Sequence, residues 1–104
     1  MTVKQLAHIV YFTLEDASEA RIEALLADMR QYLDSHPGLV HFSCGRLNPE
    51  LNRPVNDRDF HVSLHTVFVD RAAHDAYQVH PRHTEFIERN RANWKRVRVF
   101  DSDC

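Results

Sequence analysis

Residues 60–69, FHVSLHTVFV, constrain the fold more than any other stretch of the chain. Side chains alternate between the two faces of a β-strand, so a strand here presents two different surfaces. The first face is largely apolar and is formed by Phe60, Val62, Leu64, Thr66 and Phe68. The second face is mixed and is formed by His61, Ser63, His65 and Val67. The apolar face must be covered by other elements of the same chain.

The first half of the chain predicts a strand, a helix and a second strand. Residues 5–14 are rich in β-branched and aromatic side chains, which is typical of a strand. Asp16 and Glu19 have the spacing of a capping box, which predicts a helix that runs to about Asp34. The HPG sequence then ends the helix, and residues 39–47 read as a strand. One face of that strand is predicted to carry Val40, Phe42 and Cys44.

The second half predicts one long connection, two helices and a closing strand. Residues 48–59 are polar and rich in proline and asparagine, which favours an exposed connection or a flap. Asp70 is expected to cap a short helix that ends near Val79, and Pro81 to open another. Residues 95–100, KRVRVF, read as the last strand. The predicted order is therefore β-α-β-β-α-α-β.

This order predicts an α+β, ferredoxin-like fold, in which a four-stranded antiparallel sheet has its helices on one face. The 104 residues leave room for one domain, 1–104. The other face of the sheet is expected to carry Ile9 and Tyr11 together with the mixed face described above. It is too apolar in places to stay exposed to water. A second copy of the sheet would cover it, so we expect a homodimer through the sheet faces, which is a dimeric α+β barrel.

Charge and cysteine content exclude several classes of partner. A net charge of −2 with both signs spread along the chain predicts no nucleic-acid partner and no membrane partner. No apolar run approaches the roughly 20 residues of a membrane-spanning helix, and the N-terminus lacks a signal-peptide pattern. Cys44 and Cys104 do not form a Cys-x-x-Cys pair, which suits a reducing compartment. These features predict a cytoplasmic protein.

Four stretches form a pattern that extends over nearly the whole chain. They are HIVYFTL at 8–14, PGLVHFSCGR at 37–46, the spacing F…AY…HPRH…F over 68–86, and NWKRVRVFD at 93–101. Together they resemble the stress-responsive A/B barrel (Dabb) family. The resemblance implies a ferredoxin-like fold that dimerises into a barrel. The family contains stable stress-induced plant proteins, a plant polyketide cyclase that makes olivetolic acid, and many bacterial members without an assigned activity.

The resemblance to the cyclase implies a pocket between the sheet and the helices. Its acid-base residues, carried over to this chain, are His8, Tyr77 and His83. A further cyclase histidine in the third strand is replaced here by Val62, so this chain departs from the cyclase pattern at that point. The residues expected to contact a substrate are Val10, Phe12, Val62, Leu64, Phe86 and Trp94.

The stretch YQVHPRHTEF at 77–86 predicts the roles of these groups from elementary chemistry. With Pro81 at the first helical position, His80 is the N-cap and His83 lies in the first turn. The positive end of the helix dipole and partial burial both disfavour an imidazolium, so His83 is expected to be neutral and to act as general base. Tyr77 would donate a hydrogen bond to an oxyanion, and His8 would orient the substrate. Both His83 and Tyr77 also fit purely structural roles.

No metal site and no cofactor are expected. His61 and His65 lie roughly 13 Å apart along a strand at ~3.3 Å per residue, too far to share an ion. His36, His41 and His74 are expected at the surface. Phosphate loops, dinucleotide fingerprints and nucleophile elbows do not occur in the sequence.

Three functions remain open. The first is cofactor-free acid-base catalysis on a small carbonyl or aromatic compound, in the manner of a polyketide cyclase or lyase. The second is a non-catalytic stress-response or binding protein that forms a stable homodimeric barrel. The third is cofactor-independent oxidation, as in antibiotic-biosynthesis monooxygenases.

Overall fold

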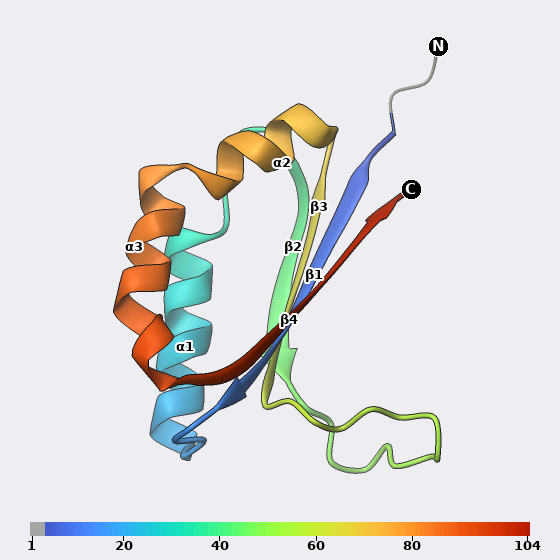
Figure 1. Ribbon diagram of the computed structural model, residues 1–104, viewed down its shortest axis with the longest axis vertical. Helices are drawn as coiled ribbons and strands as arrows, with labels where there is room; N and C mark the ends of the chain where they lie inside the picture. Colours follow the sequence, from blue (N-terminus) through green and yellow to red (C-terminus); the bar gives the residue numbers. More distant parts are fainter. Residues whose placement is uncertain (1–3) are drawn as a thin grey trace.

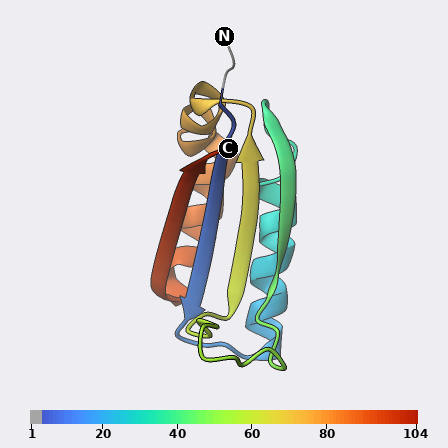
Figure 2. The same cartoon turned by 90° about the vertical axis from the view of Figure 1, so that its right-hand side faces the viewer.

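A computed structural model describes residues 4–104 and has the element order that the sequence predicts (Figure 1). The elements are β1 (Leu6–Leu14), α1 (Glu19–Tyr32), β2 (Leu39–Arg46), β3 (Val62–Phe68), α2 (Arg71–Gln78), α3 (Pro81–Asn90), the 3₁₀ turn η1 (Arg91–Asn93) and β4 (Trp94–Asp103). The strand order is β2-β3-β1-β4 with antiparallel neighbours throughout, as Figure 2 shows. The predicted ferredoxin-like α+β fold is therefore confirmed.

The core lies between one face of the sheet and the helices (Figure 1). Along β1, buried and half-buried residues alternate without interruption, so every second side chain from Leu6 to Leu14 points to the helices. Leu25, Leu26 and Met29 pack against this face from α1. Among residues 4–104, no helix combines the length and the apolar character needed to cross a membrane.

Local hydrogen bonds show where each helix begins. Asp70 accepts the backbone N–H of Ala73 at 2.8 Å, and His80 accepts that of Arg82 at 3.1 Å, so both predicted caps are confirmed. The capping box predicted at Asp16 is wrong. Asp16 instead accepts the N–H of Ser18 at 3.0 Å, and Ser18 is the N-cap residue of α1. The turn before the helix is therefore two residues longer than the capping box requires.

The connection from α1 to β2 packs tightly under α2. Gly38 has a φ of 78°, and a Cβ atom there would lie 2.5 Å from the Cβ of Ala73, so only glycine fits. A register shift between Leu39 and His41 then displaces Val40 from the face predicted for it. Val40 is 53% exposed, whereas Phe42 and Cys44 do pack against the core.

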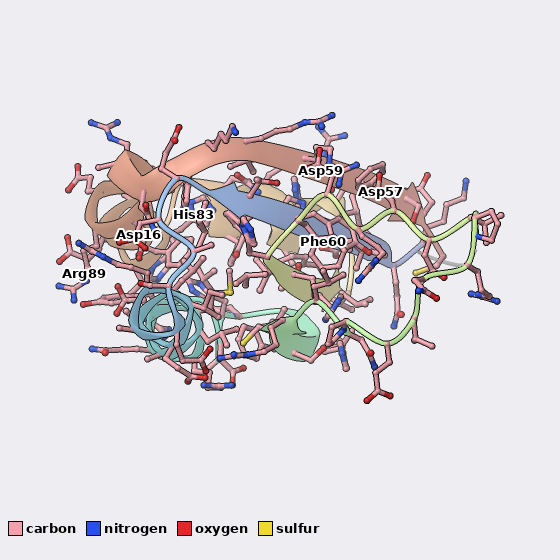
Figure 3. The ribbon with its side chains drawn as sticks, turned by 90° about the horizontal axis from the view of Figure 1, so that it is seen from below. Asp16, Asp57, Asp59, Phe60, His83 and Arg89 are labelled. Carbon is pink, nitrogen blue, oxygen red and sulfur yellow. The ribbon has the colours of Figure 1, made fainter. Side chains whose placement is uncertain are left out.

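The long connection between β2 and β3 extends to the side of the sheet opposite to the helices (Figures 1 and 3). Arg98 binds Asp57 at 2.7 Å and Arg96 binds Asp59 at 2.9 Å, so β4 holds this loop in place. The loop and the open face of the sheet enclose a cavity of about 590 Å³ that includes Tyr11 and Phe60. This open face is where a second copy would be expected.

Candidate functional site

A second cavity, of about 180 Å³, lies between the sheet and the helices. Eight of its lining residues are predicted site residues: His8, Val10, Phe12, Leu64, Tyr77, His83, Phe86 and Trp94. The other lining residues, which sequence reasoning missed, are Leu33, Gln78, Ile87, Val97 and Val99. The cavity is smaller than the ~300–1,000 Å³ of pockets for drug-sized ligands, so its ligand must be compact.

Val62 does not line this cavity, although it was expected to contact a substrate. It lies at the end of β3, opposite Phe12 and Arg46, and is fully buried in the core. Leu64, two residues further along the same face, does reach the cavity. The face predicted for Val62 and Leu64 is therefore confirmed, but only Leu64 lines the cavity. Phe60, predicted for the same face, lies instead against Tyr11 on the open face, because β3 begins only at Val62.

His8 is held in place by a carboxylate on the neighbouring strand. It lies directly opposite Asp101 of β4, and its Nδ1 atom is 2.6 Å from Oδ1 of Asp101. Burial lowers the pKa of His8, although the hydrogen bond to Asp101 acts in the opposite direction. The imidazole is therefore neutral near pH 7. Because Nδ1–H donates to the carboxylate, the Nε2 atom keeps a free lone pair.

Tyr77 has a buried hydroxyl group without a protein partner. The residue is 2% exposed, and its ring packs against Phe68, His36 and His83 with centroid separations of 4.9, 4.9 and 4.7 Å. Burial raises the pKa of Tyr77 well above its usual value, so the hydroxyl stays protonated at every physiological pH. The hydroxyl of Tyr77 is therefore a hydrogen-bond donor without an acceptor in the protein.

His83 packs edge-on against Tyr77 and is also neutral. Burial, together with the nearby imidazoles of His8, His36 and His74, lowers the pKa of His83 to about 4. Its Nδ1 atom is buried and has no protein partner. The sequence correctly predicts a neutral His83, but such a low pKa makes it a weak proton acceptor at neutral pH.

Most of the unpaired buried polar atoms belong to residues that line this cavity. In the described part of the chain, four buried side-chain nitrogen or oxygen atoms lack a partner: His36 Nδ1, Tyr77 Oη, His83 Nδ1 and Trp94 Nε1. Three of the four belong to residues that line the 180 Å³ cavity. Folded proteins pair the large majority of their buried polar groups, because an unpaired one costs roughly 1–3 kcal/mol. This arrangement is typical of a site that binds a polar ligand.

Two histidines expected at the surface lie beside this site instead. His36 is buried, donates from Nε2 to the carbonyl of Tyr32 at 2.7 Å and packs against Tyr77. His74 is 13% exposed at its side chain, and its ring centroid lies 5.1 Å from that of His8. Both predictions are wrong because the first turn after α1 and the whole of α2 fold over the end of the cavity.

The histidines on the open face form a separate group. Ser43 lies between His41 and His65, with Oγ 3.1 Å from His41 Nε2 and 2.9 Å from His65 Nδ1. His61 accepts the backbone N–H of Leu14 at 2.9 Å through Nδ1. The larger cavity on this face is lined by the loop and by ion-paired groups, and none of the unpaired buried atoms borders it. The smaller cavity is therefore the candidate functional site.

A family model described as Stress responsive A/B Barrel Domain matches residues 6–104. Among solved structures, a Dabb family protein from Mesorhizobium loti is 27% identical, with a TM-score of 0.78 over 95% of each chain. No protein with a curated description matches the sequence.

Two further structures share the fold at lower identity. A dimeric ferredoxin-like protein of unknown function from Thermobifida fusca has a TM-score of 0.82 and 16% identity, covering 98% of this chain and 92% of that one. The hydroxynitrile lyase from Passiflora edulis has a TM-score of 0.78 and 19% identity, covering 97% of this chain and 94% of that one. The fold therefore occurs in at least one enzyme.

Proposed function

This chain belongs to the stress-responsive A/B barrel domain family, and we propose that its helix-side cavity binds a small carbonyl compound and transfers a proton on it without a cofactor. The observation that supports this function best is the set of unpaired polar atoms of Tyr77, His83 and Trp94 around one small, mostly apolar space. A ligand with an apolar body and one or two polar atoms would satisfy them.

We assign the general base to His8. The bond from Nδ1 to Asp101 fixes the tautomer, so the lone pair of Nε2 is on the side of the ring away from the carboxylate. Nε2 lies 3.5 Å from the amide nitrogen of Gln78, which is another lining residue. This differs from the role that the sequence predicts for His83, whose pKa of about 4 is far from the operating pH.

Tyr77 would stabilise the charge that proton removal creates. Its protonated, unpaired hydroxyl can donate to a carbonyl oxygen, and the low dielectric constant of a buried site strengthens that bond. His83 packs on the ring of Tyr77 at 4.7 Å and, as a neutral imidazole, adds no charge of its own. It would hold the phenol in position and pair a second polar atom of the ligand through Nδ1.

The proposed reaction begins at the carbon next to the carbonyl group. His8 Nε2 takes a proton from that carbon, the electron pair of the C–H bond moves toward the carbonyl oxygen, and Tyr77 donates a hydrogen bond to the resulting enolate. The imidazolium of His8 then returns the proton, either to the same carbon or to the oxygen of a second carbonyl that the enolate carbon has attacked. No other reactant is needed for the balance.

The relatives support such a reaction only in part. The structure from Passiflora edulis is a hydroxynitrile lyase, so this fold can accommodate lyase chemistry. At 19% identity the likeness extends to the fold alone. The alternative function is non-catalytic binding, and it is favoured by the deep burial of Tyr77 and Phe86, which form part of the hydrophobic core whatever else they do.

Deuterium incorporation distinguishes catalysis from binding. Acetophenone in D₂O is incubated with the full chain, and exchange of its methyl protons is followed by ¹H NMR. We expect exchange above the buffer rate, a loss of ~10²–10⁴-fold in His8→Gln, and a comparable loss in Tyr77→Phe. Ser43→Ala, on the open face, is the control that should exchange like the wild type. Changes in the chemical shifts without exchange of the methyl protons would favour the binding protein. If neither exchange nor a shift change occurs, both the catalytic and the binding proposals are refuted.

We also propose that the protein forms a homodimer through the open sheet face. Ile9, Tyr11 and Phe100 border the larger cavity, and Phe100 is 53% exposed. Apolar groups gathered on one face of a small domain are typical of an interface. The related structure from Thermobifida fusca is described as dimeric.

A further inference from the structure

Two histidines at one end of the cavity have the same arrangement. His8 is bonded through Nδ1 to Asp101 at 2.6 Å, and His74 is bonded through Nδ1 to Asp75 at 2.9 Å. In each case the carboxylate accepts from Nδ1–H, so the lone pair of the ring lies on Nε2. Carboxylate groups orient metal-binding histidines in the same way, since they fix the tautomer and make the ring more basic.

The two free nitrogen atoms face the same point. His8 Nε2 lies 3.5 Å and His74 Nε2 lies 3.4 Å from one atom, Nε2 of Gln78. Both distances are at the upper limit for a hydrogen bond, so the amide pairs weakly with either ring. A flexible glutamine side chain can move out of this position at little cost, which leaves two converging lone pairs.

The two imidazoles and a carboxylate lie close together. One ligand atom from each of His8, His74 and Asp101 lies within 4.8 Å of the other two. A tetrahedral ion with bonds of ~2.0–2.1 Å needs its ligands about 3.3 Å apart, so the two imidazole rings must rotate to bring their Nε2 atoms to that spacing, while Asp101 stays on the Nδ1 edge of His8. His8 is buried, whereas Asp101 and Asp75 are about half exposed, which gives an ion access from solvent.

We propose that His8 and His74 form a binding site for a divalent transition-metal ion such as Zn²⁺, with water in the remaining positions and with Asp101 and Asp75 orienting the two rings. Two imidazoles select borderline ions, whereas Mg²⁺ and Ca²⁺ prefer oxygen ligands. The sequence did not suggest this pair, because 66 residues separate the two histidines and only the fold brings α2 over β1.

Metal binding at this site would act as a switch on the proposed function. The ion would occupy the Nε2 lone pair of His8, which is the atom proposed to accept the substrate proton. Occupation of the site and proton transfer therefore exclude one another. This consequence rests on the proposed function, but the metal site itself does not.

Calorimetric titration of the tag-free full chain with Zn²⁺, without any carbonyl compound present, tests the site. We expect one ion to bind per chain and binding to weaken by at least tenfold in His74→Ala. Asp75→Asn should weaken it ~10-fold through the orientation of His74. His65→Ala is the matched control, because it removes a half-buried histidine from the open-face group, and its affinity should equal that of the wild type.

Three results would overturn the proposal. They are no binding to the wild type at 100-fold excess of Zn²⁺, unchanged affinity in His74→Ala, or loss of affinity in His65→Ala that matches the loss in His74→Ala. Because no substrate is present, failure of the metal site leaves the deuterium-exchange result unaffected, and the reverse also holds.

Discussion

The Nδ1 atom of His8 lies 2.6 Å from Oδ1 of Asp101, and the two residues face each other across the β1–β4 ladder. The histidine is buried and the aspartate side chain is 46% exposed, so a carboxylate at the protein surface controls the tautomer of an imidazole in the interior. Thr66 also donates to the backbone carbonyl of His8 at 2.7 Å, which fixes this part of the strand. The base proposed here is therefore oriented before any ligand arrives.

Replacement of Asp101 by asparagine tests that orientation. An amide cannot stabilise the imidazolium that forms during proton transfer and no longer selects one tautomer. We expect Asp101→Asn to slow deuterium exchange by ~10–100-fold while the fold is retained. Asp103→Asn, two residues further on the same strand, is the control. Equal rates in the two variants would contradict the role of Asp101.

The hydroxyl of Tyr77 is expected to contribute to function and not to stability. Because it has no protein partner, Tyr77→Phe should change the free energy of unfolding by less than about 1 kcal/mol or stabilise the protein. Tyr77→Ala, which removes the buried ring, should cost ~3–5 kcal/mol. Urea denaturation measures both. A loss above 1 kcal/mol in Tyr77→Phe would mean that the hydroxyl has a structural partner.

Stability should fall as the pH is lowered through the range in which free histidine titrates. The pKa of His83 is about 4 in the folded protein and about 6.5 in the unfolded chain, and burial lowers the pKa of His36 as well. Between these two values the unfolded state binds more protons, so stability is complete above pH ~6.5 and is lost progressively toward pH ~4. The urea midpoint, measured from pH 8 to 4.5, should decrease accordingly.

His83→Gln should flatten that pH profile, since it removes the most strongly shifted imidazole. If the wild-type midpoint is the same at pH 7.5 and at pH 5, the histidines near Tyr77 are not buried in their neutral form.

The open sheet face is expected to hold the dimer together. Phe100→Glu places a charge among Ile9, Tyr11 and Phe60, and it should convert a dimer into a monomer in light scattering at micromolar concentration. Val79→Glu is the control, because Val79 is as apolar and more exposed but lies at the junction of α2 and α3. A wild-type protein that is monomeric under these conditions would refute the interface.

Strand alternation and caps were sufficient to predict the fold. The regular pattern in residues 62–68 indicated the two faces of β3, although Phe60, before the strand, lies on the face opposite to the predicted one. The caps Asp70 and His80 marked the two C-terminal helices. What failed depended on one or two residues added to a turn or strand. α1 begins at Glu19, and the side chain of its N-cap residue, Ser18, makes no capping hydrogen bond. The bulge at Val40 turns that side chain away from the face predicted for it. Neither follows from periodicity.

The site was predictable where it depends on one strand face and not where it depends on strand register. His8 shares its face of the strand with Val10 and Phe12, so the alternation of side chains along a strand predicts that His8 points to the same side of the sheet. Asp101 was missed because only the β1–β4 pairing places it opposite His8, and no local signal specifies that register. His74 was missed for a similar reason: the sequence of its helix alone predicts an exposed position, but His74 packs beside His8 of β1 in the fold.

The central claim, that His8 presents a free Nε2 lone pair to the cavity, is tested most directly by the ¹⁵N spectrum of its imidazole at pH 7. The proposed function predicts a neutral ring protonated on Nδ1, with a bare Nε2 that shifts when acetophenone is added. A ring protonated on Nε2, or a doubly protonated imidazolium, would contradict it.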